Sequence, residues 1–441
     1  MRGACRGRGP LATVGRSTLF GDVRRRGRAG LVVTVAMALV AFATYAHGVE
    51  SPTATPDESA VLLTRAETFL ATHAKIVAGE SVLLITDTSV DVTVRQAFVK
   101  AAAKAGGVVS ELVLQGYPEV TDGLEIARKM RFVRWFPEWI WMAAAQNRVV
   151  LDLSSLSSGH IGGRADLPPA TRFVDVPFAH REQLADPMAR GNYPEEILEA
   201  IARTLWKQVA GGHRFELRDP EGTELRWTLD KGAWQEVKNA DPARNAEHIS
   251  MPPPYRSKVI DMQGWLVGSS THSGPLPRIR LKVEQGRVVA VEDGKHVADY
   301  LRRMFDASRN VAFAGFPGSG SNWIEEVAIG THPRHRRVPG AETLGWSAGM
   351  ASWNGAPRAG VVHLAVGTSR SGRNFALAQQ HGLEVQHLDV EIYRPTLTVD
   401  GRTIITDGQL TALDDPEVRR VAARFGDPDD LLRVTWFPKG R

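Results

Sequence analysis

The chain has 441 residues, of which 43% are hydrophobic and 23% are charged. This composition excludes a disordered or fibrous protein and indicates two or three globular domains. Residues 1–30 hold eight arginines against one acidic residue, Asp22, so the rest of this +5 chain carries a net charge of −2. The body therefore has no excess positive charge that would indicate a nucleic-acid partner.

The N-terminal segment has the pattern of an export signal. A positive cluster, Arg24 to Arg28, precedes an apolar run from Leu31 to Ala46 and small residues around its end. This order predicts a secretory signal peptide within residues 1–50. We expect an exported protein, periplasmic or extracellular, and keep an uncleaved N-terminal membrane anchor as the alternative. The only cysteine is Cys5, so the body has no disulfide, thiolate zinc site or cysteine nucleophile.

Residues 57–210 are predicted to form an open α/β domain. Apolar spacing predicts a helix over 57–73, a buried strand over Ser81–Thr86, a helix over Val92–Ala105 and a strand over Val108–Leu114. Such a unit joins two parallel strands by a right-handed crossover. The pattern continues with a helix over 139–145, strands over 148–153 and 172–178, and a closing amphipathic helix over 194–210.

Residues 211–441 are predicted to form a second domain that is mixed, mostly antiparallel α+β. Strands over 214–219 and 224–230 flank a Pro-Glu-Gly-Thr turn, and strands over 278–283 and 287–292 flank Gln285-Gly286. Both patterns are typical of hairpins. Further strands are expected over 360–366, 387–393, 396–398 and 403–406, with a short helix over 296–305.

Ionisable residues lie inside apolar, strand-like runs of this second domain. Glu326 lies in the run 323–330, His363 in the run 360–367, and His387 and Asp389 begin the run 387–393. Burial of such groups is costly unless they are paired or bind a metal. His387 and Asp389, two residues apart on a strand, point to the same face. Glu325 is expected to face solvent while Glu326 turns inward.

A second polar cluster has two interpretations. His332 and His335, with the arginines beside them, offer ligands for an anion or a metal. A solvated loop is the preferred interpretation, because runs of charge usually face water.

Four further motifs, with the runs above, give the chain a family resemblance. They are the strand Gly79–Ile85, the helix end Ala101–Gly107, the hairpin Asp219–Leu225 and the tail Val399–Gly408. In this order, over residues 60–410, the chain resembles the aminopeptidase T family of metallopeptidases, also called the thermophilic or AmpS type. The resemblance implies a metal-binding catalytic domain in residues 211–441.

The resemblance also implies a dinuclear site with two divalent metal ions. In this family two glutamates, two histidines and an aspartate bind the ions, and their counterparts here are Glu247, Glu326, His363, His387 and Asp389. The glycine that precedes the first glutamate in the family is absent before Glu247. Carboxylates suit a pair of hard or borderline cations and imidazoles add affinity for zinc or cobalt. Iron and manganese are the alternatives.

Arg370 marks a departure from the family. The family has a tyrosine seven residues after the histidine that matches His363, and this chain has Arg370 there. A guanidinium can stabilise an oxyanion, so Arg370 is the candidate catalytic residue. The resemblance implies an aminopeptidase-like hydrolase that acts on short peptides or another small-molecule substrate through metal-activated water. It also implies a homodimer. The N-terminal segment indicates membrane contact only through an uncleaved anchor.

Two other functions are consistent with the sequence. A mononuclear iron(II) ring-cleaving dioxygenase is one, because dihydroxypyridine dioxygenases resemble this family and keep the pair matched by His387 and Asp389. These dioxygenases have a histidine at the position that matches Glu326 and lack a histidine at the position that matches His363. The residues of this chain therefore favour the two-metal hydrolase. A non-catalytic exported binding protein is the other, and Arg370 supports it.

Overall fold

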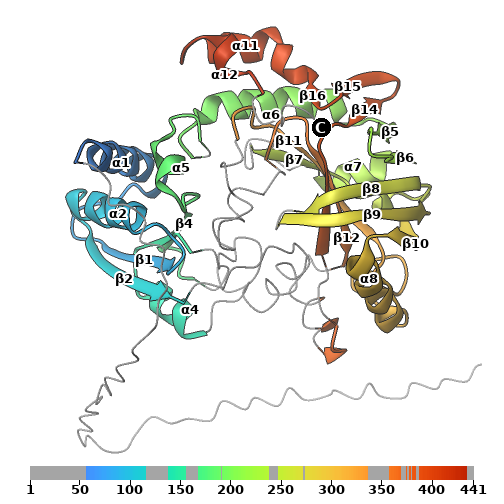
Figure 1. Ribbon diagram of the computed structural model, residues 1–441, viewed down its shortest axis with the longest axis horizontal. Coiled ribbons are helices and arrows are strands. Elements are labelled where there is room, and N and C mark those ends of the chain that lie inside the picture. Colours follow the sequence, from blue (N-terminus) through green and yellow to red (C-terminus); the bar gives the residue numbers. More distant parts are fainter. Residues whose placement is uncertain are drawn as a thin grey trace, which may run out of the picture. The chain divides into compact units, whose positions relative to one another are not determined.

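The computed structural model describes most of the body of the chain (Figure 1). The described residues are 56–115, 138–154, 167–189, 191–237, 247–271, 274–335, 357–368, 374, 377–378, 380–383 and 387–434. The predicted leader, residues 1–50, lies outside them, and its role in export stays a prediction. Residues 51–441 group as one compact unit. None of the helices in the described ranges has the length and hydrophobicity that crossing a bilayer requires.

The first sheet is parallel and has the order β2-β1-β3-β4. Its strands match the sequence prediction closely. Side chains on both faces of β1 are buried, as expected for a parallel sheet that is covered by helices on two sides. The strands are β1 (Ser81–Asp87), β2 (Val108–Leu114), β3 (Val149–Asp152) and β4 (Arg172–Asp175).

Helices cover the two faces of this sheet. Val82 and Leu84 of β1 pack in one apolar cluster with α1 and α2, whereas Leu83 and Ile85 pack with α4 on the other face. Asp91 begins α2 by accepting a hydrogen bond from the backbone N–H of Thr93, a typical N-cap. The helices are α1 (Pro56–Phe69), which continues into the π-helical η1 (Leu70–Ala74), α2 (Val92–Lys104), α4 (Glu138–Ala145) and α5 (Arg181–Ala185).

The second sheet has eight strands in the order β10-β9-β8-β6-β5-β14-β15-β16. Both predicted hairpins are present, as the antiparallel pairs β5–β6 and β9–β10. The strands are β5 (Arg214–Arg218), β6 (Glu224–Thr228), β8 (Gln263–Thr271), β9 (Gly274–Glu284), β10 (Arg287–Asp293), β14 (Thr396–Val399), β15 (Arg402–Thr406) and β16 (Gln409–Leu410).

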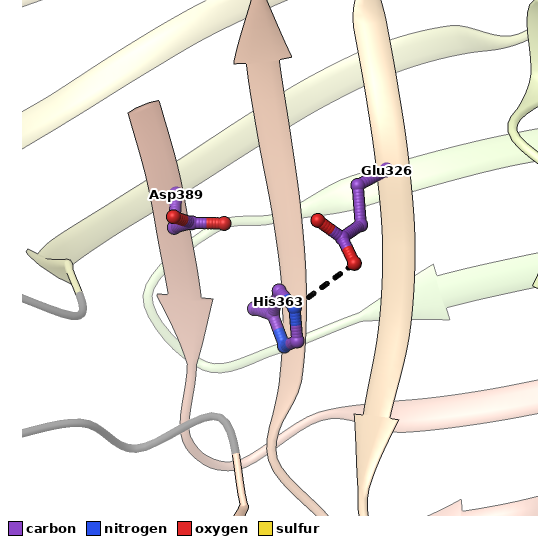
Figure 2. A group of neighbouring side chains, drawn as sticks. All are labelled: Glu326, His363 and Asp389. Atoms are coloured by element: carbon purple, nitrogen blue, oxygen red, sulfur yellow. Dashed lines mark ion pairs between the residues drawn. The ribbon is translucent and has the colours of Figure 1, made fainter. Parts of the chain in front are cut away.

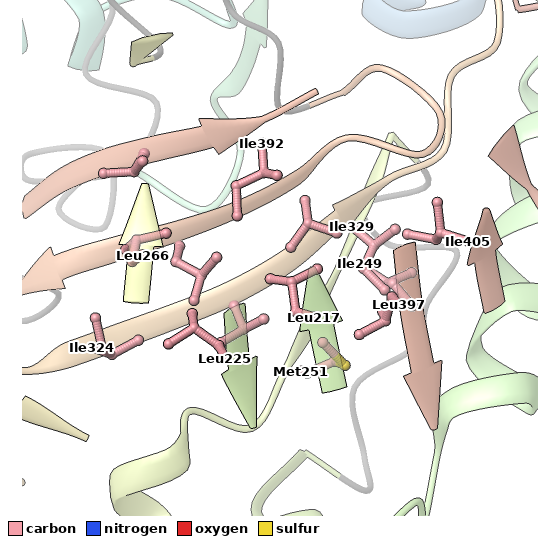
Figure 3. Close-up of a cluster of buried hydrophobic side chains, with 14 of the residues drawn as sticks. Leu217, Leu225, Ile249, Met251, Leu266, Ile324, Ile329, Ile392, Leu397 and Ile405 are labelled. Carbon is pink, nitrogen blue, oxygen red and sulfur yellow. The ribbon is translucent and has the colours of Figure 1, made fainter. Parts of the chain in front are cut away.

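The third sheet is antiparallel, has the order β13-β12-β11-β7, and carries the residues of the candidate site. Alternate side chains of β11, β12 and β13 enter the largest apolar core, which they share with β5, β6, β8 and β14 of the second sheet. Figure 3 shows these apolar side chains between the strands. The strands are β7 (His248–Met251), β11 (Ile324–Gly330), β12 (Val362–Gly367) and β13 (His387–Ile392).

The remaining helices pack around these antiparallel sheets. The buried side chains of α6 (Glu195–Val209), which the sequence analysis places in the first domain, belong to the large core of the second and third sheets. The expected division into 57–210 and 211–441 stays a prediction. The other helices are α7 (Lys231–Val237), α8 (Lys295–Ser308), α11 (Pro416–Ala422) and α12 (Pro428–Leu431), with short 3₁₀ turns at η4 (Pro254–Arg256) and η6 (Thr411–Asp414). The α/β fold class, with one parallel sheet and antiparallel sheets, is confirmed.

Candidate metal centre

One face of the third sheet gathers ionisable groups that come from three adjacent strands. Asp389 of β13 and Glu326 of β11 both pair with Ala365 of β12, so they lie in one row across the sheet. His363 lies two residues before Ala365 and therefore on the same face. One nitrogen or oxygen of each of Glu326, His363 and Asp389 lies within 4.8 Å of the others, and all three residues are buried (Figure 2).

Small residues leave room for this group. Asp389 and Glu326 are two strands apart, roughly 10 Å between backbones, and their carboxyl groups meet above the methyl group of Ala365. Ala328 and Gly330, which follow Glu326 along β11 on the same face, are small residues as well. The other face of the same strands carries Val327 and Leu364 in the apolar core. The sheet therefore has one apolar face in the core and one polar face, also buried, that carries the site.

His387 joins the cluster through the carboxyl groups. Its Nε2 lies 3.1 Å from Asp389 Oδ1 and 3.5 Å from Glu326 Oε2, and its Nδ1 lies 2.9 Å from Glu325 Oε1. Burial alone would lower the pKa of His387, but the charges of Asp389 and Glu325 outweigh it and raise the pKa to about 9. A buried imidazolium in this position replaces part of the positive charge that a metal ion would supply.

Glu325 is buried, so the expectation that it faces solvent is wrong. The pairing of β11 with β12 shifts between Ile324 and Glu326, which identifies a β-bulge at Glu325. A bulge places two consecutive residues of one strand opposite a single residue of the neighbouring strand, and it disturbs the alternation of side chains. Both glutamates are consequently buried, with Glu325 2% and Glu326 4% exposed, and Glu325 contacts His387.

We expect Glu325→Gln to weaken metal binding by about 10- to 100-fold, because a carboxylate on the distal nitrogen orients a ligating imidazole and raises its basicity. The measurement is a zinc titration of the purified protein against a competing chelator. Glu284→Gln is the matched control, since Glu284 is an exposed partner of Lys282 on β9. Equal zinc affinity for the two variants would contradict an orienting role for Glu325.

A hydrogen-bonded polar group flanks His363. Glu391 of β13 lies directly across from His363. Its Oε2 accepts hydrogen bonds from Ser270 Oγ at 2.9 Å and from the Tyr393 hydroxyl at 2.5 Å. Burial and the neighbouring Glu391 raise the pKa of Tyr393 well above its usual value, so this phenol stays protonated as a donor near neutral pH. No local sequence pattern indicates this group, because Ser270 comes from a different sheet.

Two ligand candidates, Glu247 and His387, are absent from the group of Glu326, His363 and Asp389, and of these His387 contacts its carboxyl groups. Glu247 has no such contact among those described above. It precedes β7, and its carbonyl oxygen accepts a hydrogen bond from the N–H of Thr331. The assignment of Glu247 as a ligand stays a prediction. Arg370, the candidate catalytic residue, lies outside the described residues.

The second polar cluster is buried, so the preference for a solvated loop at His332 and His335 is wrong. His332 is 0% and His335 is 3% exposed. The ring of His332 lies 4.7 Å from that of Tyr193, and Arg358 donates to the carbonyl oxygen of His335. An isolated β-bridge pairs His332 with Arg358, which is itself buried.

Comparisons with known proteins extend these observations only at the level of the fold. No protein-family model matches the chain, and no curated protein matches it. The structure of 2,5-dihydroxypyridine dioxygenase from Pseudomonas putida KT2440 is similar over 82% of this chain and 99% of its own, with 15% identity and a TM-score of 0.52. Wild-type AmpT from Thermus thermophilus is similar over 80% of this chain and 99% of its own, with 18% identity and a TM-score of 0.46.

Proposed function

We propose that the protein is a metal-dependent hydrolase that removes N-terminal residues from short peptides. The observation that carries the proposal is the position of Glu326 between two imidazoles. Its Oε1 lies 3.7 Å from His363 Nε2, and its Oε2 lies 3.5 Å from His387 Nε2. A carboxylate with each oxygen directed to a different imidazole suits a bridge between two adjacent cations.

The donor set fits divalent ions. Glu325, Glu326 and Asp389 bring three carboxyl groups to the cluster, and in the metal-free protein the imidazolium of His387 offsets one negative charge. To bind an ion, His387 would release its Nε2 proton. Buried carboxylates need such compensation, which divalent cations provide. Glu326 would bridge a pair of ions, with His363 on one side and His387 and Asp389 on the other.

The remaining chemistry follows from these residues. A bound pair of ions would polarise a peptide carbonyl and make a shared water acidic near neutral pH. Glu325 holds the His387 ring in one orientation through Nδ1. A free α-amine of the substrate would be held at an open metal position or by a carboxylate, which suits a substrate with a free N-terminus. The sequence resemblance to the aminopeptidase T family also supports short peptides with a free N-terminus as substrates.

An iron(II) dioxygenase is the second candidate. Two observations favour it: the fold is similar to that of a dioxygenase, and Glu326, His363 and Asp389 alone offer one ion three ligands on a single face. Facial triads of such oxygenases have two histidines and one carboxylate. His363, His387 and Asp389 supply such a set. The bridged pair is preferred because the Glu326 carboxylate lies between the two imidazoles.

Metal removal and peptide assays distinguish the two candidates. We expect the purified protein to release the first residue of short peptides, to lose this activity with a chelator, and to regain it with zinc or cobalt. N-acetylated peptides, which lack the α-amine, should remain intact. Mass spectrometry of the products and metal analysis provide the measurements. One iron per chain with oxygen uptake on a dihydroxylated ring would contradict the hydrolase and support the dioxygenase.

A further inference from the structure

We infer that His248, the residue after Glu247, is the metal ligand that β7 contributes to the site beside His363. The inference rests on the proposed metal site but not on the reaction assigned to it. It begins with the alternation of side chains along β7. Ile249 and Met251 enter the apolar core, whereas His248 and Ser250 are only half-buried and lie on the opposite face.

The register of β7 shows that this opposite face is the face of the site. Ser250 pairs with Ala328, which in turn pairs with His363. Ser250 Oγ lies 3.4 Å from Glu326 Oε1, so β7 already contacts one member of the cluster. His248 is two residues from Ser250 and therefore projects from the same surface.

Gly330 allows the ring of His248 to reach the centre. His248 pairs directly with Gly330 of β11, which has no side chain to separate β7 from β12. The rings of His248 and His363 consequently approach to 5.8 Å between centroids, at 71° to each other. Two imidazoles on one zinc ion, with Zn–N bonds of ~2.1 Å and tetrahedral angles, have centroids roughly 5 Å apart. The observed separation of the two rings is within ~1 Å of that value.

The surroundings of Glu247 agree with this assignment. Glu247 lies in the turn before β7, outside the strand whose alternation points His248 to the site. Desolvation lowers the pKa of His73, and the charges of Glu195 and Glu247 oppose that effect. The Glu247 carboxylate therefore lies within electrostatic range of His73 on η1.

A matched pair of substitutions tests the inference without any assay of turnover. His248→Gln and His248→Glu have side chains of nearly equal size, but only the second offers a carboxylate. Each full-length variant is titrated with cobalt(II), and binding is followed by visible absorption. We expect His248→Gln to weaken binding of one ion by at least ~100-fold and His248→Glu to restore it to within ~10-fold of wild type. Glu247→Gln should bind cobalt as the wild type does.

Each other outcome has a defined meaning. Wild-type affinity in His248→Gln, or loss of the ion in Glu247→Gln, would overturn the role of His248. The absence of cobalt binding in the wild type would overturn this inference together with the metal site. Normal metal binding without peptide hydrolysis would overturn the proposed reaction and leave the inference intact. Circular dichroism of the metal-free variants confirms that each is folded.

Discussion

Glu326→Gln is expected to lower kcat/KM for peptide hydrolysis by roughly 10³-fold or more, because the neutral amide removes the charge shared by both proposed ion positions. The substitution preserves size and keeps the side chain between His363 and His387. Metal content should fall in parallel, below one ion per chain. Metal analysis by mass spectrometry and a peptide assay at several zinc concentrations measure the two effects.

The control for this substitution is Glu292→Gln on β10, where an exposed glutamate pairs with Arg280. It should keep full activity and metal content. The metal-free Glu326→Gln protein should also be no less stable than the metal-free wild type, since one of three crowded carboxyl groups has become neutral. Retention of both ions and of activity in Glu326→Gln would refute the bridging role.

Gly360→Ala is expected to destabilise the protein by at least ~3 kcal/mol. Gly360 has a φ of +81°, and an added Cβ would lie 2.0 Å from the carbonyl oxygen of Gly408. Relief of this clash requires a backbone shift just before β12, the strand that carries His363. Urea denaturation followed by circular dichroism measures the free energy of unfolding.

Gly401 provides a control with nearly the same backbone conformation. Its φ is +79°, and an added Cβ would have no atom within 4 Å. Gly401→Ala should therefore cost only about 1–2 kcal/mol, the cost of a left-handed conformation in an L-residue. Equal losses in the two variants would show that conformation alone, and not the contact with Gly408, sets the requirement at Gly360.

Much of the fold could be predicted because local patterns determine it. β1 is an apolar run that ends at Asp87, β2 begins directly after Gly107, and the helix between them has a clear amphipathic spacing. Glu326, His363 and Asp389 could be identified for a related reason. Each interrupts an apolar strand, and such an interruption is costly without a compensating ligand or partner.

Other features depended on tertiary context. The bulge at Glu325 breaks the two-residue alternation on which strand predictions rest, and the bulge is visible only from the pairing with β12. The assignment of the metal ligand near β7 also depends on tertiary context. A shift of one residue, from Glu247 to His248, moves a side chain to the other face of a strand. His332 is buried through its bridge to Arg358, a contact that no local pattern indicates.

The order of strands in the eight-stranded sheet has a consequence for the course of folding. β14 lies between β5 and β15, and Thr396 pairs with Arg218. During synthesis the sheet therefore stays incomplete until the last strands leave the ribosome, whereas β1 to β4 form their sheet from an early stretch of the chain. Long-range pairing of this type slows folding. The N-terminal parallel sheet should gain protection from hydrogen exchange earlier in refolding than β5, whose partner is made so much later.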